Sequence, residues 1–269
     1  MKTFVFLHDA FQGGWIWRDA ARSLRSLGCE AYTPSFTGCG ARRHLTVDGS
    51  PRTTYLADIE NLFIHENIPQ AALVCHGFAG MLAPLLARRL GAKVQAIIFL
   101  EAALPEKGES FMDLAQPPLA GLLRKRERNG MVRPVEPSLF DTLELGDYFQ
   151  DRLGPFPMRA FTETYDGPEP VRWPYSAYLY CGANQTPFNT AMLARARTRG
   201  LDAHDGALDA VPVLARFDEI ARLLDAMVPR PSPSPAHEGC GRPRMPEHMR
   251  LLHCPRYRQR MALARSHGD

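Results

Sequence analysis

Short apolar runs alternate with amphipathic stretches along most of the chain. The apolar runs predict strands, and the stretches in which apolar residues recur every three or four positions predict helices. The expected strands are Thr3–Leu7, Glu30–Thr33, Ala71–Cys75, Val94–Leu100 and Ser176–Cys181, and the expected helices lie near Ile16–Leu27, Thr53–Asn67, Phe78–Leu90 and Ala215–Met227. This alternation predicts an α/β fold with a mostly parallel central sheet flanked by helices.

The alternation is interrupted between residues 105 and 172, which are rich in Pro, Arg and Glu and have broken helical patterns. We expect a helical cap insertion here, within a core formed by residues 1–104 and 173–228. Such an insertion covers the carboxyl ends of the strands, where α/β sheets usually place their sites. Repeated prolines in Pro229–Pro235 predict a mostly disordered, Pro- and Arg-rich tail over residues 229–269.

The formal charge of +3 is unevenly distributed, because the last forty residues hold eight Arg against three acidic residues. The first 229 residues carry a net charge of −2, which is not typical of nucleic-acid binding by a folded domain. The run Arg124–Arg128 in the insertion is typical of a solvated helix face, although it could also draw an anionic substrate toward a site.

Cysteine and histidine spacing gives no sign of a metal site or a disulfide framework. The six cysteines include no C-x-x-C pair, which is typical of reduced thiols in the cytoplasm, and the His and Cys residues of the tail lack zinc-finger spacing. The opening apolar run, Thr3–Leu7, is too short for a signal peptide. We therefore expect a cytoplasmic protein without metal or cofactor and without a membrane span.

The segment Cys75-His76-Gly77-Phe78-Ala79-Gly80 follows an apolar strand and opens a helix rich in small residues. This is the setting of a nucleophile elbow, G-x-S-x-G, in which a serine is held at a strained strand-to-helix turn. Gly77 stands where that serine would be, and glycine has no oxygen to form an acyl intermediate. Cys75 and His76 are expected to be ordinary buried residues of this turn.

Residues 1–228 resemble the α/β-hydrolase superfamily, most closely its small esterase and hydroxynitrile-lyase-like branch. The likeness is carried by Phe6–Trp17, by the elbow Cys75–Gly80, by Leu100–Ser110, and by Tyr180–Gln185 together with Gly200–Asp205. It implies an α/β-hydrolase fold with a cap, in which a serine attacks, a histidine transfers its proton, an acid orients the histidine and backbone amides hold the oxyanion.

Carried over by position, the resemblance places Gly77 at the nucleophile, Asn184 at the acid and His204 at the histidine, on a loop after a strand. Asp9 takes the place of the usual oxyanion glycine. A carboxylate there would repel a developing oxyanion unless it is protonated or turned away. Asp9 could instead be an acid or base, or only cap its loop.

Four further residues complete the candidate site. Glu101 could orient His204, or it could be a solvated carboxylate at the end of a strand. Ala10 and Phe78 adjoin the oxyanion and nucleophile positions and are expected to border the substrate. Trp15 is expected to pack in the core, although it could reach the mouth of the pocket.

Three functions fit these residues. The first is a cofactor-free lyase, cyclase or isomerase in which His204, with Asp9 or Glu101, moves protons on a small, apolar, carbonyl-bearing substrate. The second is an inactive, ligand-binding pseudoenzyme, and the third is a weak esterase that uses water activated by His204. The expected partner is this small molecule alone, and a homodimer is left open.

Overall fold

A parallel sheet forms the centre of the computed structural model, which describes residues 1–134, 151–167, 175–180, 182, 186–205 and 217–230. The strands are β1 Thr3–Leu7, β2 Glu30–Tyr32, β3 Ala71–His76, β4 Val94–Leu100, β5 Glu127–Arg128, β6 Met131–Val132, β7 Phe156–Pro157, β8 Ser176–Tyr180 and β9 Asp202–Asp205. The α-helices are α1 Arg18–Ser26, α2 Pro51–His65, α3 Ala83–Leu90, α4 Phe111–Leu114, α5 Gln116–Lys125, α7 Met158–Thr162, α8 Pro187–Thr198 and α9 Phe217–Met227. Short 3-10 helices are η1 Gly14–Trp17, η2 Gly40–Arg42, η3 Gly77–Met81 and η4 Gly91–Lys93.

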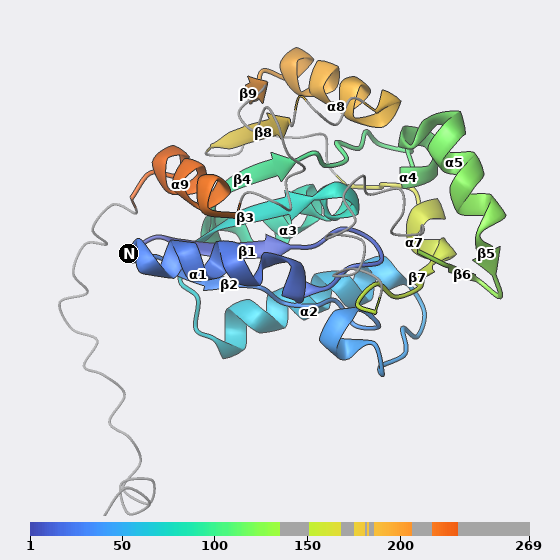
Figure 1. Cartoon of the computed structure of the whole chain (residues 1–269), viewed down its shortest axis with the longest axis horizontal. Helices are drawn as coiled ribbons and strands as arrows, with labels where there is room; N and C mark the ends of the chain where they lie inside the picture. Colours follow the sequence, from blue (N-terminus) through green and yellow to red (C-terminus); the bar gives the residue numbers. More distant parts are fainter. Residues whose placement is uncertain (135–150, 168–174, 181, 183–185, 206–216, 231–269) are drawn as a thin grey trace, which may run out of the picture. The chain divides into compact units, whose positions relative to one another are not determined.

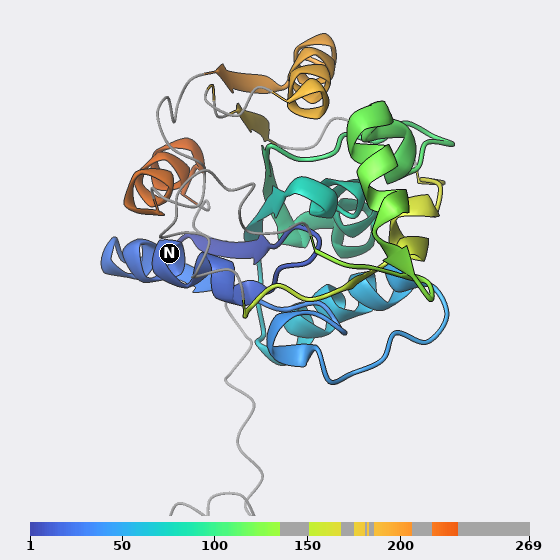
Figure 2. The ribbon, with the colours of Figure 1, turned by 45° about the vertical axis from the view of Figure 1, so that its right-hand side comes forward.

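The sheet has the order β2-β1-β3-β4-β8-β9 among the described residues, and each of its neighbouring pairs is parallel. Alternate residues of each strand point to opposite faces, so the sheet has two cores. Helices α1 and α9 cover the face that carries Phe4 and Val74, and α2, α3 and α8 cover the face that carries Val5 and Leu73 (Figure 2). The predicted α/β fold with a mostly parallel sheet is confirmed.

The ends of the flanking helices follow local capping chemistry. The Ser50 hydroxyl accepts a hydrogen bond from the Thr53 amide at 3.2 Å, and Pro51 occupies the first turn of α2. Helix α8 begins in the same way, with Thr186 as the cap and Pro187 as the next residue. A Ser, Thr or Asp cap supplies an acceptor to an amide that has no partner within the helix. The start of α8 is thereby fixed at the carboxyl end of β8.

The insertion between β4 and β8 lies beyond the carboxyl ends of β1, β3 and β4 (Figure 1). Its described part contains the expected helices, α4, α5 and α7, and also a small antiparallel sheet, β5-β6-β7, that the sequence pattern did not predict. Each of these strands has two residues, which is too short for an alternating pattern. The predicted tail lies outside the described residues from residue 231 onward.

Candidate active site

Gly77 forms the turn between β3 and η3, at the carboxyl end of the sheet. Its φ is +53°, in the left-handed region that favours glycine, and its carbonyl accepts a hydrogen bond from the Ala103 amide at 2.9 Å. The strained strand-to-helix turn expected for an elbow is therefore present, although no hydroxyl stands on it.

The carboxylate of Asp9 fills the position in which an oxyanion would bind. Asp9 Oδ1 accepts hydrogen bonds from the backbone amides of Phe78, at 2.6 Å, and of Ala10, at 2.7 Å. These are two convergent N–H donors of the kind that stabilises a developing oxyanion, and they suit a charged carboxylate oxygen equally well. Asp9 is thus not turned away from the hole, and both amides are already engaged.

The same carboxylate also takes the space of the missing nucleophile. A Cβ atom built on Gly77 would lie 2.1 Å from Asp9 Cγ, 2.2 Å from Oδ1 and 2.4 Å from Oδ2. These distances are far below van der Waals contact, so any side chain at position 77 would require Asp9 to move. The observed position of the Asp9 carboxylate therefore requires a residue without a side chain at position 77.

Two side chains hold the loop that carries Asp9. His8 is buried, its Nε2 accepts from the Phe36 amide at 3.1 Å, and its Nδ1 lies 2.7 Å from the Asp9 carbonyl oxygen. Because the amide can only donate to Nε2, the proton of the neutral ring sits on Nδ1 and is donated to that carbonyl. Gln12 adds a bond from the Asp9 amide to its Oε1, at 3.3 Å.

Stability should fall in acid because of His8. Burial lowers the pKa of His8 to about 4 from its ordinary 6.5, so between these values the unfolded chain takes up a proton that the folded chain does not. This group alone should reduce the free energy of unfolding by about 1.4 kcal/mol per pH unit as pH falls from 6.5 toward 4. Urea unfolding of the wild type and of His8→Phe at pH 7 and pH 5 measures the difference. The matched control removes an exposed imidazole instead of a buried one, through His44→Gln.

Asp9 and Gly77 open onto a cavity of about 400 Å³ under the cap. This volume lies in the range of small-molecule sites. The polar lining residues are Asp9, His76, Glu101, Thr186 and Asn189. The apolar ones, from the cap and the start of α8, are Phe111, Ala115, Pro118, Leu119, Leu122, Pro187 and Phe188. The arrangement offers two carboxylates at the base of a mainly apolar chamber.

Glu101 follows β4 directly and lines the cavity with only 6% of its surface exposed. The expectation of a solvated carboxylate at this position is wrong. The φ of Glu101 is +46°, a region that non-glycine residues enter rarely, and its amide donates to the Leu179 carbonyl at 3.0 Å. Strained backbone of this kind is concentrated at functional sites.

His76 borders the cavity, but its ring packs edge-on against Trp17, with the ring centroids 5.6 Å apart. Burial lowers the pKa of His76, and the nearby charge of Asp9 opposes this shift. Cys75 is fully buried beside it, and burial raises the pKa of its thiol, which disfavours the thiolate needed for attack. Both residues have the surroundings expected of structural residues.

Phe78 contributes its amide to Asp9 and its ring to an aromatic cluster between cap and core. Its centroid lies 5.0 Å from that of Phe156, 5.7 Å from that of Phe111 and 5.8 Å from that of Phe161. These distances lie in the range of favourable aromatic pairs. Trp15 packs instead on the cluster beneath α1, and it is not among the residues that line the cavity in the described part of the chain.

His204 does not lie on a loop, contrary to the expectation from sequence. It is the third residue of β9, paired with Leu179, and its Nε2 lies 3.0 Å from Asp202 Oδ2. The Asp202 carboxylate also accepts from the Tyr175 hydroxyl at 2.9 Å and is half exposed. Among the described residues, the cavity lining includes Asp9 and Glu101 but not His204. The predicted acid position, Asn184, lies outside the described residues.

Thr186 and Asn189 also line the cavity, although neither was predicted from the sequence as a site residue. The signal was present, because Thr186-Pro187 is a helix-start pattern placed directly after the loop that carries the acid position. Within the described residues, no group of three or more His, Cys, Asp or Glu side chains is arranged to hold a metal ion. No described helix has both the length and the apolar character needed to cross a membrane.

Three known proteins illustrate the similarities of this chain. The carbendazim hydrolyzing esterase of Nocardioides sp. (strain SG-4G) is 36% identical over 156 residues, which are 53% of this chain and 64% of the esterase. An extracellular alpha/beta-hydrolase from a Paenibacillus species superposes with a TM-score of 0.73 at 20% identity, over 86% of this chain and 100% of that one. Tomato Methylketone Synthase I complexed with 2-tridecanone gives a TM-score of 0.61 at 14% identity, over 84% of this chain and 98% of the other.

The family model described as the alpha/beta hydrolase family matches residues 4–253. This match spans most of the chain, and the sheet order, the elbow turn and the cap agree with it. The chain therefore belongs to the α/β-hydrolase family.

Proposed function

We propose that this protein is a cofactor-free enzyme that moves protons on a small, largely apolar carbonyl compound without forming an acyl-enzyme. The observation that carries the proposal is the position of the Asp9 carboxylate, which occupies both the oxyanion hole and the space of the nucleophile. Asp9 is the group that we assign to proton transfer, and Glu101 is the second carboxylate of the cavity.

The arrangement argues against serine-type ester hydrolysis. There is no hydroxyl on the elbow, and the two amides that would bind the tetrahedral oxyanion already hold Asp9. Loss of the serine nucleophile in subtilisin costs about a millionfold in rate. Elimination, isomerisation and cyclisation need an acid and a base but no such oxyanion hole.

The cavity also restricts the charge of the reacting group. Two carboxylates in a mainly apolar chamber repel an anion and leave it without the solvation that it has in water. The reacting part of the substrate is therefore neutral. Fold relatives of this chain include a methylketone synthase bound to 2-tridecanone and a variant of it bound to beta-ketoheptanoate, which supports chemistry on carbonyl compounds in this fold.

A second function is favoured by the esterase relative at 36% identity. In this alternative, Asp9 acts as a general base on water, which attacks an ester or carbamate carbonyl slowly. The absence of free amide donors at Asp9 limits the rate, because the oxyanion would have to be stabilised elsewhere. This alternative differs from the weak esterase expected from the sequence, because Asp9 and not His204 activates the water.

Exchange of protons for deuterium next to a carbonyl tests the main proposal without knowledge of the natural substrate. 2-Nonanone and 2-tridecanone are incubated in D₂O, and exchange at the α carbon is followed by NMR. Wild type should accelerate exchange, and Asp9→Asn, which keeps the size of the side chain but not the base, should be at least about 100-fold slower. His204→Ala is the matched control and should stay within about threefold of wild type, since His204 is directed to Asp202.

Exchange that depends on His204 and not on Asp9 would show that the proton transfer is assigned to the wrong residue. If neither ketone exchanges but both bind in calorimetry, the ligand-binding pseudoenzyme is the better description. Release of acid from a panel of aryl esters and carbamates, lost in Asp9→Asn, would favour hydrolysis by activated water.

A further inference from the structure

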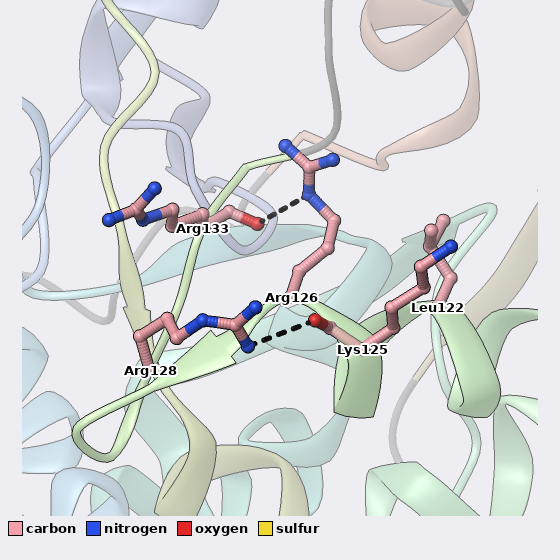
Figure 3. Close-up of a pocket in the computed structure, with 5 residues that line it drawn as sticks. All are labelled: Leu122, Lys125, Arg126, Arg128 and Arg133. Carbon is pink, nitrogen blue, oxygen red and sulfur yellow. Dashed lines mark hydrogen bonds between the residues drawn. The ribbon is translucent and has the colours of Figure 1, made fainter.

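A second cavity, of about 320 Å³, lies on the cap where α5 meets β5 and β6 (Figure 3). We call it the basic groove. It is lined by one apolar residue, Leu122, and by four cations, Lys125, Arg126, Arg128 and Arg133. The first 229 residues carry a net charge of −2, so this groove is a local concentration of positive charge on an otherwise near-neutral protein.

Two of the guanidinium groups are held in place by backbone carbonyls. Arg126 Nε donates to the Arg133 carbonyl at 3.3 Å, and Arg128 Nη1 donates to the Lys125 carbonyl at 3.2 Å (Figure 3). Arg128 Nη1 also donates to the Glu127 carbonyl at 2.6 Å. Arg126 Nη2 donates in addition to the Pro134 carbonyl. A guanidinium has five N–H donors, so these bonds fix each group and leave further donors for a ligand.

The positive charge of the groove is not neutralised within the described residues. None of the ion pairs between described residues involves one of its four cations, and Lys125 and Arg133 make no side-chain hydrogen bond in that part of the chain. The neighbouring carboxylate of Glu127 accepts from the Gly130 amide at 2.6 Å and is not part of the lining. Fixed guanidinium groups that have further donors, and no carboxylate partner among the described residues, are suited to phosphate oxygens.

Leu122 is shared by the linings of the basic groove and of the candidate active site. It lines the groove and also the 400 Å³ cavity that contains Asp9 and Glu101. One cavity is mainly apolar with acidic residues at its base, and the other is basic. A molecule that spans both would place its neutral, apolar part in the cavity and its anionic end in the groove, because the opposite orientation sets like charges together.

We propose that the substrate is an amphiphilic phosphate, whose apolar, carbonyl-bearing part enters the cavity and whose phosphate or diphosphate end binds the basic groove. The identity of the cavity as the reaction site rests on the proposed function, whereas the binding of phosphate does not. Lys125 and Arg133 contribute the exposed charges, and the bonds of Arg126 and Arg128 set the shape of the groove.

Calorimetry with octyl phosphate, below its micelle concentration, measures this binding without any turnover. Lys125→Gln/Arg133→Gln should weaken octyl phosphate about tenfold, since two charged contacts are lost at a partly exposed site. The matched control is Arg43→Gln/Lys93→Gln, which removes two exposed cations elsewhere and should change the affinity less than twofold. Equal weakening by both double variants would overturn the proposal, since it would reflect net charge alone.

A chain-length series tests the connection through Leu122. From butyl to octyl phosphate the affinity should rise, at most about fourfold for each added CH₂ group that enters the cavity. Leu119→Trp, which fills part of the cavity, should flatten this rise and leave inorganic pyrophosphate binding unchanged. No dependence on chain length in the wild type would overturn the placement of the apolar part.

A lipid headgroup offers the same phosphate chemistry as a soluble ligand. Sedimentation with vesicles of phosphatidic acid, against phosphatidylcholine vesicles, separates these two sources, and we expect equal, low binding to both. Binding to phosphatidic acid vesicles without binding of soluble octyl phosphate would overturn the proposal in favour of a lipid surface. Full proton exchange by Asp9→Asn would count against the proposed function but would leave the phosphate measurements unaffected.

Discussion

Gly77→Ser alone should destabilise the protein by roughly 3 kcal/mol and give no esterase activity, whereas Asp9→Gly/Gly77→Ser should recover about half of that stability. The Cβ of the serine would lie 2.1 Å from Asp9 Cγ, and position 77 has a φ of +53°. Changing Asp9 to glycine removes the clash but not the cost of the φ angle, which is about 1 to 2 kcal/mol for an L-residue. Urea unfolding of the wild type, of Asp9→Gly, of Gly77→Ser and of the double variant gives the coupling energy between positions 9 and 77.

Gly200→Ser is the control for the backbone term, since its φ is +68° and no atom lies within 4 Å of its Cβ position. This variant should lose only the unfolding free energy that a positive φ angle costs an L-residue. If Gly77→Ser unfolds with the same free energy as Gly200→Ser, the carboxylate of Asp9 does not occupy the nucleophile space, and the proposed function loses the observation that carries it.

The same geometry restricts any attempt to restore a hydrolase. Gly77→Ser/Asn184→Asp supplies a hydroxyl on the elbow and a carboxylate at the position that the family resemblance implies for the acid, but the amides of Ala10 and Phe78 still hold Asp9. Only the variants that also carry Asp9→Gly should react with an active-site fluorophosphonate, because only they present a hydroxyl beneath two free donors. Labelling followed by intact mass spectrometry measures this outcome.

The sheet was predictable because its strands are buried on both faces. The run Val94–Leu100 predicted β4 with its observed bounds, and the first and third strands were predicted to within one residue. Strand β9 was missed, because Asp202-Ala203-His204-Asp205 lies at the sheet edge and has no apolar run. The placement of His204 on a loop failed for the same reason.

The sequence predicted which residues form the candidate site, but it did not predict how their side chains are arranged. Both Asp9 and Gly77 were recognised as departures from the pattern of the family. That they compensate each other depends on the side-chain rotamer of Asp9 and on the distance between two loops 68 residues apart, which no local pattern encodes. The burial of Glu101 could not be predicted from the local sequence either, because the cap residues that cover it come later in the chain.

Among substitutions that add one methyl group near the elbow, we expect Gly80→Ala to lower the free energy of unfolding most. A Cβ at Gly80 would lie 2.0 Å from the Ala103 carbonyl oxygen and 2.7 Å from the Ala103 amide nitrogen, and both are backbone atoms that cannot rotate away. Ala103 also donates its amide to the Gly77 carbonyl at 2.9 Å, so any shift there would move the elbow.

We expect Gly80→Ala to lose at least about 3 kcal/mol of unfolding free energy, or to be recovered only in the insoluble fraction, because a packed backbone must separate to admit the methyl group. Gly121→Ala is the matched control. It lies inside α5 with no atom within 4 Å of its Cβ position, and alanine there should stabilise the helix by up to about 1 kcal/mol. Urea unfolding of both variants separates the two cases. If Gly80→Ala is as stable as Gly121→Ala, then the segment that follows β4 is not packed against the elbow at Ala103.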